Sequence, residues 1–351
     1  MTQPEVKHTA LSASRIKTLE KCSWSYWCNY ILKLPEKSND GASRGNVVHL
    51  VLECLAKQKR KIYVRTILAT GDIFTFKSIK KLALKHARKL RVSDPDNVDL
   101  IKEMTLTALK YDFWGDAEKL PSQDLQERDF DITVDKKDKK YRIKGFIDRQ
   151  FIYDDNTSVI RDYKTSKAVF AGKDAEDNIQ HMIYTLASNK LDPKHKPLME
   201  FLFLKFDLKD NSKDGGLLKM QPPDKNELSE FENHLTEVQK IVDNFSEPDA
   251  YSNFAADKPM PSDGSFSGKL ACGFAKYKGH LKKDGNPMWH CPYKFGFNYY
   301  ALRDKDNKII KTFLEENVDE AFKIVKQGEK VTKEAYLGCP KHLTSSQKSL
   351  A

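Results

Sequence analysis

Apolar residues recur at helical spacing through most of the first 120 residues of the chain. The segment 78–91 shows this well, because its apolar residues follow one another at intervals of three and four and therefore share one face of a helix. They are Ile79, Leu82, Ala83, Ala87 and Leu90. Similar spacing predicts further helices over 15–32, 44–61 and 98–114, and Pro35 closes the first of them.

The pattern changes from helical spacing to alternation near residue 128. Alternating residues predict three strands joined by the short turns KKDKK and DDNT, which join antiparallel neighbours. The strands are expected over 128–134, 141–153 and 158–164. A helix, an apolar strand and an amphipathic helix follow over 174–189, 199–208 and 227–245. This order of elements predicts an α/β core.

The last hundred residues have a different composition from the rest. Residues 248–300 are rich in Pro, Gly and Ser and contain few periodic stretches, which is typical of loops. We therefore expect three parts: an N-terminal helical region over 1–120, an α/β core over 121–247 and a loop-rich C-terminal extension over 248–351.

The composition is that of a folded, basic protein. Hydrophobic residues make up 39% of the 351 residues, which excludes wholesale disorder, and 60 basic against 50 acidic residues leave a net charge of +10. Such a charge favours a polyanionic partner. No apolar run approaches the ~20 residues of a membrane-spanning helix. The start, MTQPEVKHTA, lacks the apolar segment of a secretory signal, so we expect a cytoplasmic chain with reduced cysteines.

Two strands of the predicted meander carry acidic side chains that can meet. Asp148 lies on the middle strand, and Asp162 and Lys164 lie on the next strand and point to one face of it. Two facing carboxylates repel each other unless a cation such as Mg²⁺ lies between them. A lysine beside that ion can orient and deprotonate a water for attack on a phosphodiester. Acids at strand ends are also common as surface ion pairs, so these motifs alone leave both interpretations open.

Further short motifs lie around this pair. Taken singly, each is also explained by packing or by an ordinary helix face. Along the chain the motifs are Ser12-x-Ser14 followed by Cys22, Gly45-x-x-x-His49, Gly145-x-x-Asp148-Arg149, Asp162-x-Lys164 and Gln180-x-x-x-Tyr184. In this order they resemble the RecB-like (Cas4-like) branch of the PD-(D/E)XK nuclease superfamily.

The resemblance implies a restriction-endonuclease-like core, which is a mixed central sheet flanked by helices. It implies a deoxyribonuclease that depends on Mg²⁺ or Mn²⁺, with His49, Asp148 and Asp162 as metal ligands and Lys164 catalytic beside the two aspartates. Gln180 and Tyr184 match the motif that contributes to the active site and to DNA contact in that branch.

The same resemblance implies a role in DNA processing. An exonuclease of recombination, repair or phage DNA processing is the expected function, with a helicase or recombination protein as a partner and a bacterial or phage origin. A structure-specific endonuclease and a non-catalytic DNA-binding subunit with the same fold are the alternatives. The intact set of Asp148, Asp162 and Lys164 favours an enzyme over a binding subunit.

Many members of that branch hold a [4Fe–4S] cluster on one N-terminal and three C-terminal cysteines. The cysteines that match in number are Cys22, Cys272, Cys291 and Cys339. Their wide spacing and the absence of a Cys-x-x-Cys pair depart from the pattern. A zinc site that adds His280 and His290 to Cys272 and Cys291, and thiols without metal, are the alternatives. We expect Cys28 and Cys54 to be ordinary helix residues.

One helix has a strongly basic face. The segment 77–91 contains seven basic residues and no acidic one. Lys81, Lys85 and Arg88 lie opposite its apolar stripe, where they can contact the DNA backbone. A face of this kind is also common as a solvated surface.

Overall fold

The computed structural model describes residues 8–36, 39–116, 118–170, 178–208, 215–258 and 271–343. The chain forms two compact units. The first unit contains Met1–Ala13 and Ser38–Lys240, and the second contains Ser14–Lys37 and Ile241–Ala351. Among the described residues, no helix is both long and apolar enough to cross a bilayer.

A five-stranded mixed sheet forms the centre of the first unit. Its strands follow the order β1-β2-β3-β4-β5. The first three are antiparallel neighbours, β4 runs parallel to β3, and β5 is antiparallel to β4. Their bounds are Gln123–Asp135, Lys140–Ile152, Thr157–Lys164, Lys196–Phe203 and Leu217–Met220. The α/β fold and the antiparallel meander are confirmed, whereas β5 was not predicted.

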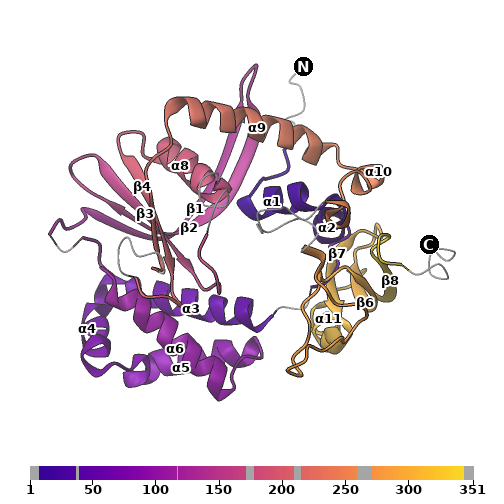
Figure 1. Ribbon diagram of the computed structural model, residues 1–351, viewed down its shortest axis with the longest axis horizontal. Coiled ribbons are helices and arrows are strands. Elements are labelled where there is room, and N and C mark those ends of the chain that lie inside the picture. The colour runs from indigo at the N-terminus through magenta and orange to yellow at the C-terminus, as the bar shows by residue number, and fades with distance from the viewer. Residues whose placement is uncertain are drawn as a thin grey trace. The chain divides into compact units, whose positions relative to one another are not determined.

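Helices flank this sheet, as expected of a restriction-endonuclease-like core. Figure 1 shows α3 to α6 on one side of the sheet and α8 on the other. The bounds of the first group are Asp40–Ala56, Lys61–Thr70, Lys77–Lys89 and Pro95–Lys110. Helix α3 begins four residues before its predicted start, because the Asn39 side chain accepts a hydrogen bond from the Ala42 N–H and caps the helix. Helix α4 was not predicted.

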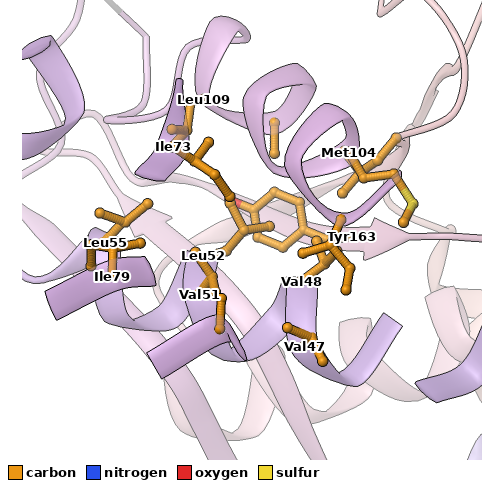
Figure 2. Close-up of a cluster of buried hydrophobic side chains, with 14 of the residues drawn as sticks. Val47, Val48, Val51, Leu52, Leu55, Ile73, Ile79, Met104, Leu109 and Tyr163 are labelled. Carbon is orange, nitrogen blue, oxygen red and sulfur yellow. The ribbon is translucent and has the colours of Figure 1, made fainter. Parts of the chain in front are cut away.

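The apolar stripes of α3, α5 and α6 meet in one buried cluster. Ile79, Ala83 and Ala87 of α5 are almost fully buried in it, as their spacing predicted. Tyr163 of β3 belongs to the same cluster, and Figure 2 shows its ring beside Val48 and Leu52 of α3. Because strand side chains alternate, burial of Tyr163 on this side points Asp162 and Lys164 to the opposite face of β3.

Helices α8 (Ile179–Leu191) and α9 (Lys225–Asp243) follow the meander. The Asn178 side chain caps α8 by accepting hydrogen bonds from the Gln180 and His181 N–H groups. The predicted helix 174–189 is thus confirmed from residue 179, and its first residues, 174–177, lie outside the described part of the chain. The Gln239 side chain of α9 accepts a hydrogen bond from the backbone of the β1–β2 hairpin at Arg142.

The second unit begins with a broken helix. One continuous helix was expected over 15–32, which is wrong. The chain instead forms α1 (Ala13–Lys21), α2 (Ser23–Tyr26) and a π-helical turn (Trp27–Ile31). The break falls at Cys22, whose backbone is extended with φ −162° and ψ 112°. Helical periodicity does not show such a break, because the residues on both sides of Cys22 are also compatible with a helix.

The C-terminal part of this unit contains a small sheet that the loop-like composition did not predict. Its strands follow the order β7-β6-β8. In that order their bounds are Ile309–Leu314, Phe295–Arg303 and Lys330–Gly338. The unit also contains the short helices α10 (Glu247–Ala250) and α11 (Val318–Ile324). Trp24 packs in its core and donates a hydrogen bond of 2.7 Å from Nε1 to the Tyr336 hydroxyl. Trp24 is therefore a core residue of this unit. The predicted domain limits at residues 120 and 247 stay a prediction.

Candidate active site

Asp148 and Asp162 lie at the point where β2 and β3 separate. The last paired residues of the two strands are Arg149 and Arg161, so the next position of each strand places Asp148 opposite Asp162. Beyond this last pair, the Asp148 side chain takes the place of a backbone acceptor on β2. Its Oδ2 accepts a hydrogen bond of 2.9 Å from the Tyr163 N–H of β3. The strand geometry thus brings together the two carboxylates that the sequence predicted to meet.

Arg149, the next residue of the same motif, has a supporting role. It is 1% exposed, and its guanidinium donates hydrogen bonds of 2.9 and 2.8 Å to both carboxylate oxygens of Asp124. Bidentate hydrogen bonds to a carboxylate stabilise a buried arginine. The pair ties β1 to β2 directly beside Asp148.

A third carboxylate, that of Glu127, belongs to the site and was missed by the sequence analysis. Gln126 and Arg128 of β1 pair with Arg149 and Ile147 of β2, so Glu127 lies opposite Asp148. Its φ of 45° falls in the left-handed region, which is rare for residues other than glycine and is concentrated at functional sites.

His49 completes a set of possible metal ligands. Its imidazole lies on α3, with Nδ1 3.4 Å from the Asp148 carboxylate. One ligand atom each from His49, Glu127 and Asp148 lie within 4.8 Å of one another. Carboxylate oxygens and imidazole nitrogen are ligands for Mg²⁺, Mn²⁺ and other divalent ions. These residues therefore fit a divalent metal ion.

Asp162 and Lys164 form an ion pair next to this set. Lys164 Nζ lies 2.6 Å from Asp162 Oδ2. Gln180 of α8 contacts both residues, because its Nε2 donates to Asp162 Oδ1 and its Oε1 accepts from Lys164 Nζ, each at 2.6 Å. The Tyr184 hydroxyl accepts from Gln180 and donates to the Phe146 carbonyl, both at 2.7 Å. Gln180 and Tyr184 thus hold Asp162 and Lys164 in position.

The charges of the site shift the pKa values of its groups. Burial raises the pKa of the Glu127 carboxyl, and the neighbouring Asp148 carboxylate adds to this effect, so that the pKa is about 7. Burial and the Asp148 carboxylate also raise the pKa of Asp162, although Lys164 opposes them. Burial lowers the pKa of His49, but the Asp148 carboxylate outweighs burial and raises that pKa to about 9. Acids that resist ionisation and a histidine that stays protonated are signs of excess negative charge, which a metal cation would offset.

Most of the side chains of the site, but not that of Glu127, line one open cavity of about 940 Å³ in the first unit. His49, Asp148, Asp162, Lys164, Gln180 and Tyr184 are all among its lining residues. We call it the active-site cavity.

The other predicted site residues lie elsewhere. Lys81, Lys85 and Arg88 are exposed on α5, opposite its buried stripe. In the second unit, four cysteines line a separate cavity of about 220 Å³. They are Cys22, Cys272, Cys291 and Cys339. Neither His280 nor His290 lines that cavity.

The remaining two cysteines lie on helical segments, as expected, and both pack against hydrophobic cores. Cys28 is fully buried in the core of the second unit, and Cys54 packs against the core of the first. The environment of the four cavity cysteines is different, because all of them line the same small space. Burial raises the pKa of the Cys291 thiol to about 12, and Cys22 and Cys272 add to this effect.

Residues 10–258 match the family model of the PD-(D/E)XK nuclease superfamily. The match covers the five-stranded sheet and the helices that carry His49 and Gln180, and the chain therefore belongs to this superfamily. Nuclease activity with a divalent metal ion follows from that membership together with the histidine and carboxylate set. No curated protein matches the chain.

Proposed function

We propose that the protein is a deoxyribonuclease of the RecB-like (Cas4-like) branch that uses Mg²⁺ or Mn²⁺ and removes nucleotides from DNA ends. The observation that supports this most is the meeting of His49, Glu127 and Asp148 within 4.8 Å beside the ion pair of Asp162 and Lys164. This group combines metal ligands with a cation that can act on water.

Each residue has a distinct part in the proposed reaction. His49, Glu127, Asp148 and Asp162 would hold the metal, which supplies charge stabilisation for the phosphate and lowers the pKa of a bound water. Lys164 orients the attacking water and takes part in its deprotonation. Gln180 keeps Lys164 and Asp162 at their present separation, and Tyr184 anchors Gln180 to the Phe146 carbonyl.

The ligand set favours Mn²⁺ as well as Mg²⁺. Mg²⁺ prefers oxygen ligands alone, whereas later divalent ions accept imidazole nitrogen more readily. Because His49 is part of the set, we expect Mn²⁺ to support activity at lower concentration than Mg²⁺.

The four cavity cysteines support a [4Fe–4S] cluster as a second cofactor. Cys22, Cys272, Cys291 and Cys339 are far apart in the sequence but line one cavity. The main-chain N–H of Cys291 donates to the Cys272 carbonyl at 3.1 Å, so two of the candidate ligands are held at the base of one loop. A [4Fe–4S] cluster is held by four cysteine thiolates, the number that this cavity offers.

The proposed context is DNA recombination, repair or phage DNA processing inside the cell, beside a helicase or recombination protein. The exposed Lys81, Lys85 and Arg88 offer a face for the DNA backbone. None of the described cysteines forms a disulfide.

A digest of end-labelled DNA tests this proposal. Linear single-stranded and double-stranded DNA and a closed circle are incubated with Mg²⁺, Mn²⁺ or EDTA. We expect metal-dependent release of short products from linear DNA and no cutting of the circle. Cutting of the circle would identify an endonuclease. Binding without cleavage under every condition would identify a non-catalytic subunit.

A further inference from the structure

Three cations line the active-site cavity in addition to Lys164. They are Arg44 of α3, Lys167 in the segment after β3, and Lys205 in the segment after β4. We call them the cation trio. None of them is required to hold the metal or to activate water, so the proposed reaction leaves their presence at the cavity unexplained.

The topology of the sheet brings the trio together. Strands β3 and β4 are parallel, so the segments that carry Lys167 and Lys205 leave the same edge of the sheet. The Leu204 N–H donates to the Lys164 carbonyl at 2.8 Å and continues that pairing beyond the strand ends. Ligands of open α/β sheets bind outside the carboxyl ends of such strands.

Helix α3 places Arg44 against the same edge. The next residue is Gly45, where a Cβ atom would lie 2.6 Å from the Thr165 hydroxyl. A larger residue at this position would force the Thr165 side chain or the helix to shift. The glycine of the Gly-x-x-x-His motif thus has a physical role, which is to bring Arg44 beside the segment that carries Lys167.

None of the trio forms an ion pair among the described residues, although the charge of the Asp94 carboxylate interacts with that of Arg44. Arg44 is 8% exposed, its Nη1 donates to Asn97, and its Nε has no hydrogen-bond partner in the described part of the chain. Burial lowers the pKa of Lys205, and repulsion from Arg44 and Lys167 adds to this effect. Asp40 is exposed and also lines the cavity, but within the same described ranges it forms no ion pair with the trio. Clustered cations of this kind form a site for an anion.

We propose that Arg44, Lys167 and Lys205 form a phosphate subsite for a second phosphate of the strand whose scissile phosphate lies at Asp148 and Asp162. This inference rests on the proposed nuclease function. The subsite takes either the phosphate of a strand end or an internal phosphate of the backbone. An end phosphate carries about two negative charges against one for an internal phosphate, so it offsets the three cations more fully.

Binding measurements with Lys167→Gln/Lys205→Gln test the subsite without relying on cleavage. Arg44 is left in place because it is buried and its loss could unfold the protein. The matched control is Lys136→Gln/Lys137→Gln, which removes the same two charges from exposed positions in the β1–β2 turn. All proteins also carry Lys164→Ala, so that DNA stays intact in Mg²⁺. Equal thermal midpoints of unfolding would establish that the variants are folded.

The dissociation constants of short oligonucleotides with a 5′-phosphate, a 3′-phosphate or only hydroxyl ends are compared by fluorescence anisotropy. If the subsite takes an end phosphate, the double variant binds the matching phosphorylated oligonucleotide about tenfold more weakly and no longer distinguishes it from the hydroxyl form. If it takes an internal phosphate, the double variant binds all three about equally more weakly than the control.

Equal binding by the Lys167→Gln/Lys205→Gln variant and the Lys136→Gln/Lys137→Gln control would overturn the subsite, as would a failure of the parent protein to bind any of the oligonucleotides. Failure of the nuclease proposal is a separate result. It would appear as absence of metal-dependent cleavage by the wild-type protein, whatever the binding measurements show.

Discussion

Glu127 of β1 lies opposite Asp148 of β2, and the two carboxylates share one metal-ligand set with His49. Acidic side chains directly opposite each other destabilise an antiparallel pair. The raised pKa of Glu127, about 7, reflects burial and this repulsion. Glu127 thus combines an unfavourable pairing of two carboxylates with an unusual backbone φ of 45°. Both features agree with a role of Glu127 in metal binding.

Glu127→Gln therefore tests the metal site. We expect the concentration of Mn²⁺ needed for half-maximal activity to rise about tenfold or more, because a charged ligand is removed. Calorimetric titration of the protein with Mn²⁺ should show the same loss without any DNA present. Asp129→Asn, an exposed change on the same strand, is the control. Unchanged Mn²⁺ affinity of Glu127→Gln would exclude Glu127 as a ligand.

We expect His181 of α8 to make the stability of the first unit depend on pH. Burial lowers its pKa to about 4 in the folded protein, whereas an unfolded chain has a histidine pKa of about 6.5. Below pH 6.5 the unfolded state therefore binds a proton that the folded state does not. Stability is lost as the pH falls from about 6.5 to about 4, by up to about 3 kcal/mol.

His181→Leu should remove this part of the pH dependence. The free energy of unfolding is measured by urea denaturation at several values between pH 7 and pH 4.5. As the pH falls, the free energy of unfolding of the wild type should decrease relative to that of the variant. Parallel curves over that range would contradict the assignment.

The four cavity cysteines give a prediction about iron. Anaerobically purified protein should be brown and contain iron and acid-labile sulfide, and Cys291→Ser should lose the colour and loosen the second unit. Cys54→Ser, which changes a packing cysteine of the first unit, should keep the iron. Colourless wild-type protein with neither iron nor zinc would show that these residues are ordinary thiols.

The basic face of α5 gives a prediction about salt. Changing Lys81, Lys85 and Arg88 to Glu should weaken binding to every DNA sequence. The slope of log K against log salt should fall by roughly 1 for each phosphate that these side chains no longer neutralise. A slope equal to that of wild type would mean that this face is only solvated.

Much of the core could be predicted from its pattern of residues. The meander follows from alternation and short turns, and the facing of Asp148 and Asp162 follows from the same geometry. Glu127 was missed because the first strand was started at residue 128, whereas β1 begins at Gln123. The hairpin turn already determines the register, since Asp135 pairs with Lys140. Counting back from that pair would have placed Glu127 opposite Asp148.

The second unit was harder to predict for a physical reason. Its core joins Trp24 to Tyr293 and Tyr336, which are distant in sequence, and local composition carries no sign of such contacts. The break at Cys22 is also invisible to periodicity. It depends on contacts such as the 2.8 Å hydrogen bond from the Ser23 N–H to the Asn253 carbonyl. Long-range contacts of this kind override local helix preference.

The rate of DNA cleavage by Lys164→Ala, measured beside wild type and Asp162→Ala with the same DNA and Mg²⁺, tests the central claim most directly. Lys164 Nζ lies 2.6 Å from Asp162 Oδ2 and contacts Gln180 at the cavity. We expect both variants to lose cleavage by at least about a hundredfold while they still bind DNA. Cleavage at the wild-type rate by either purified variant would contradict the proposed mechanism.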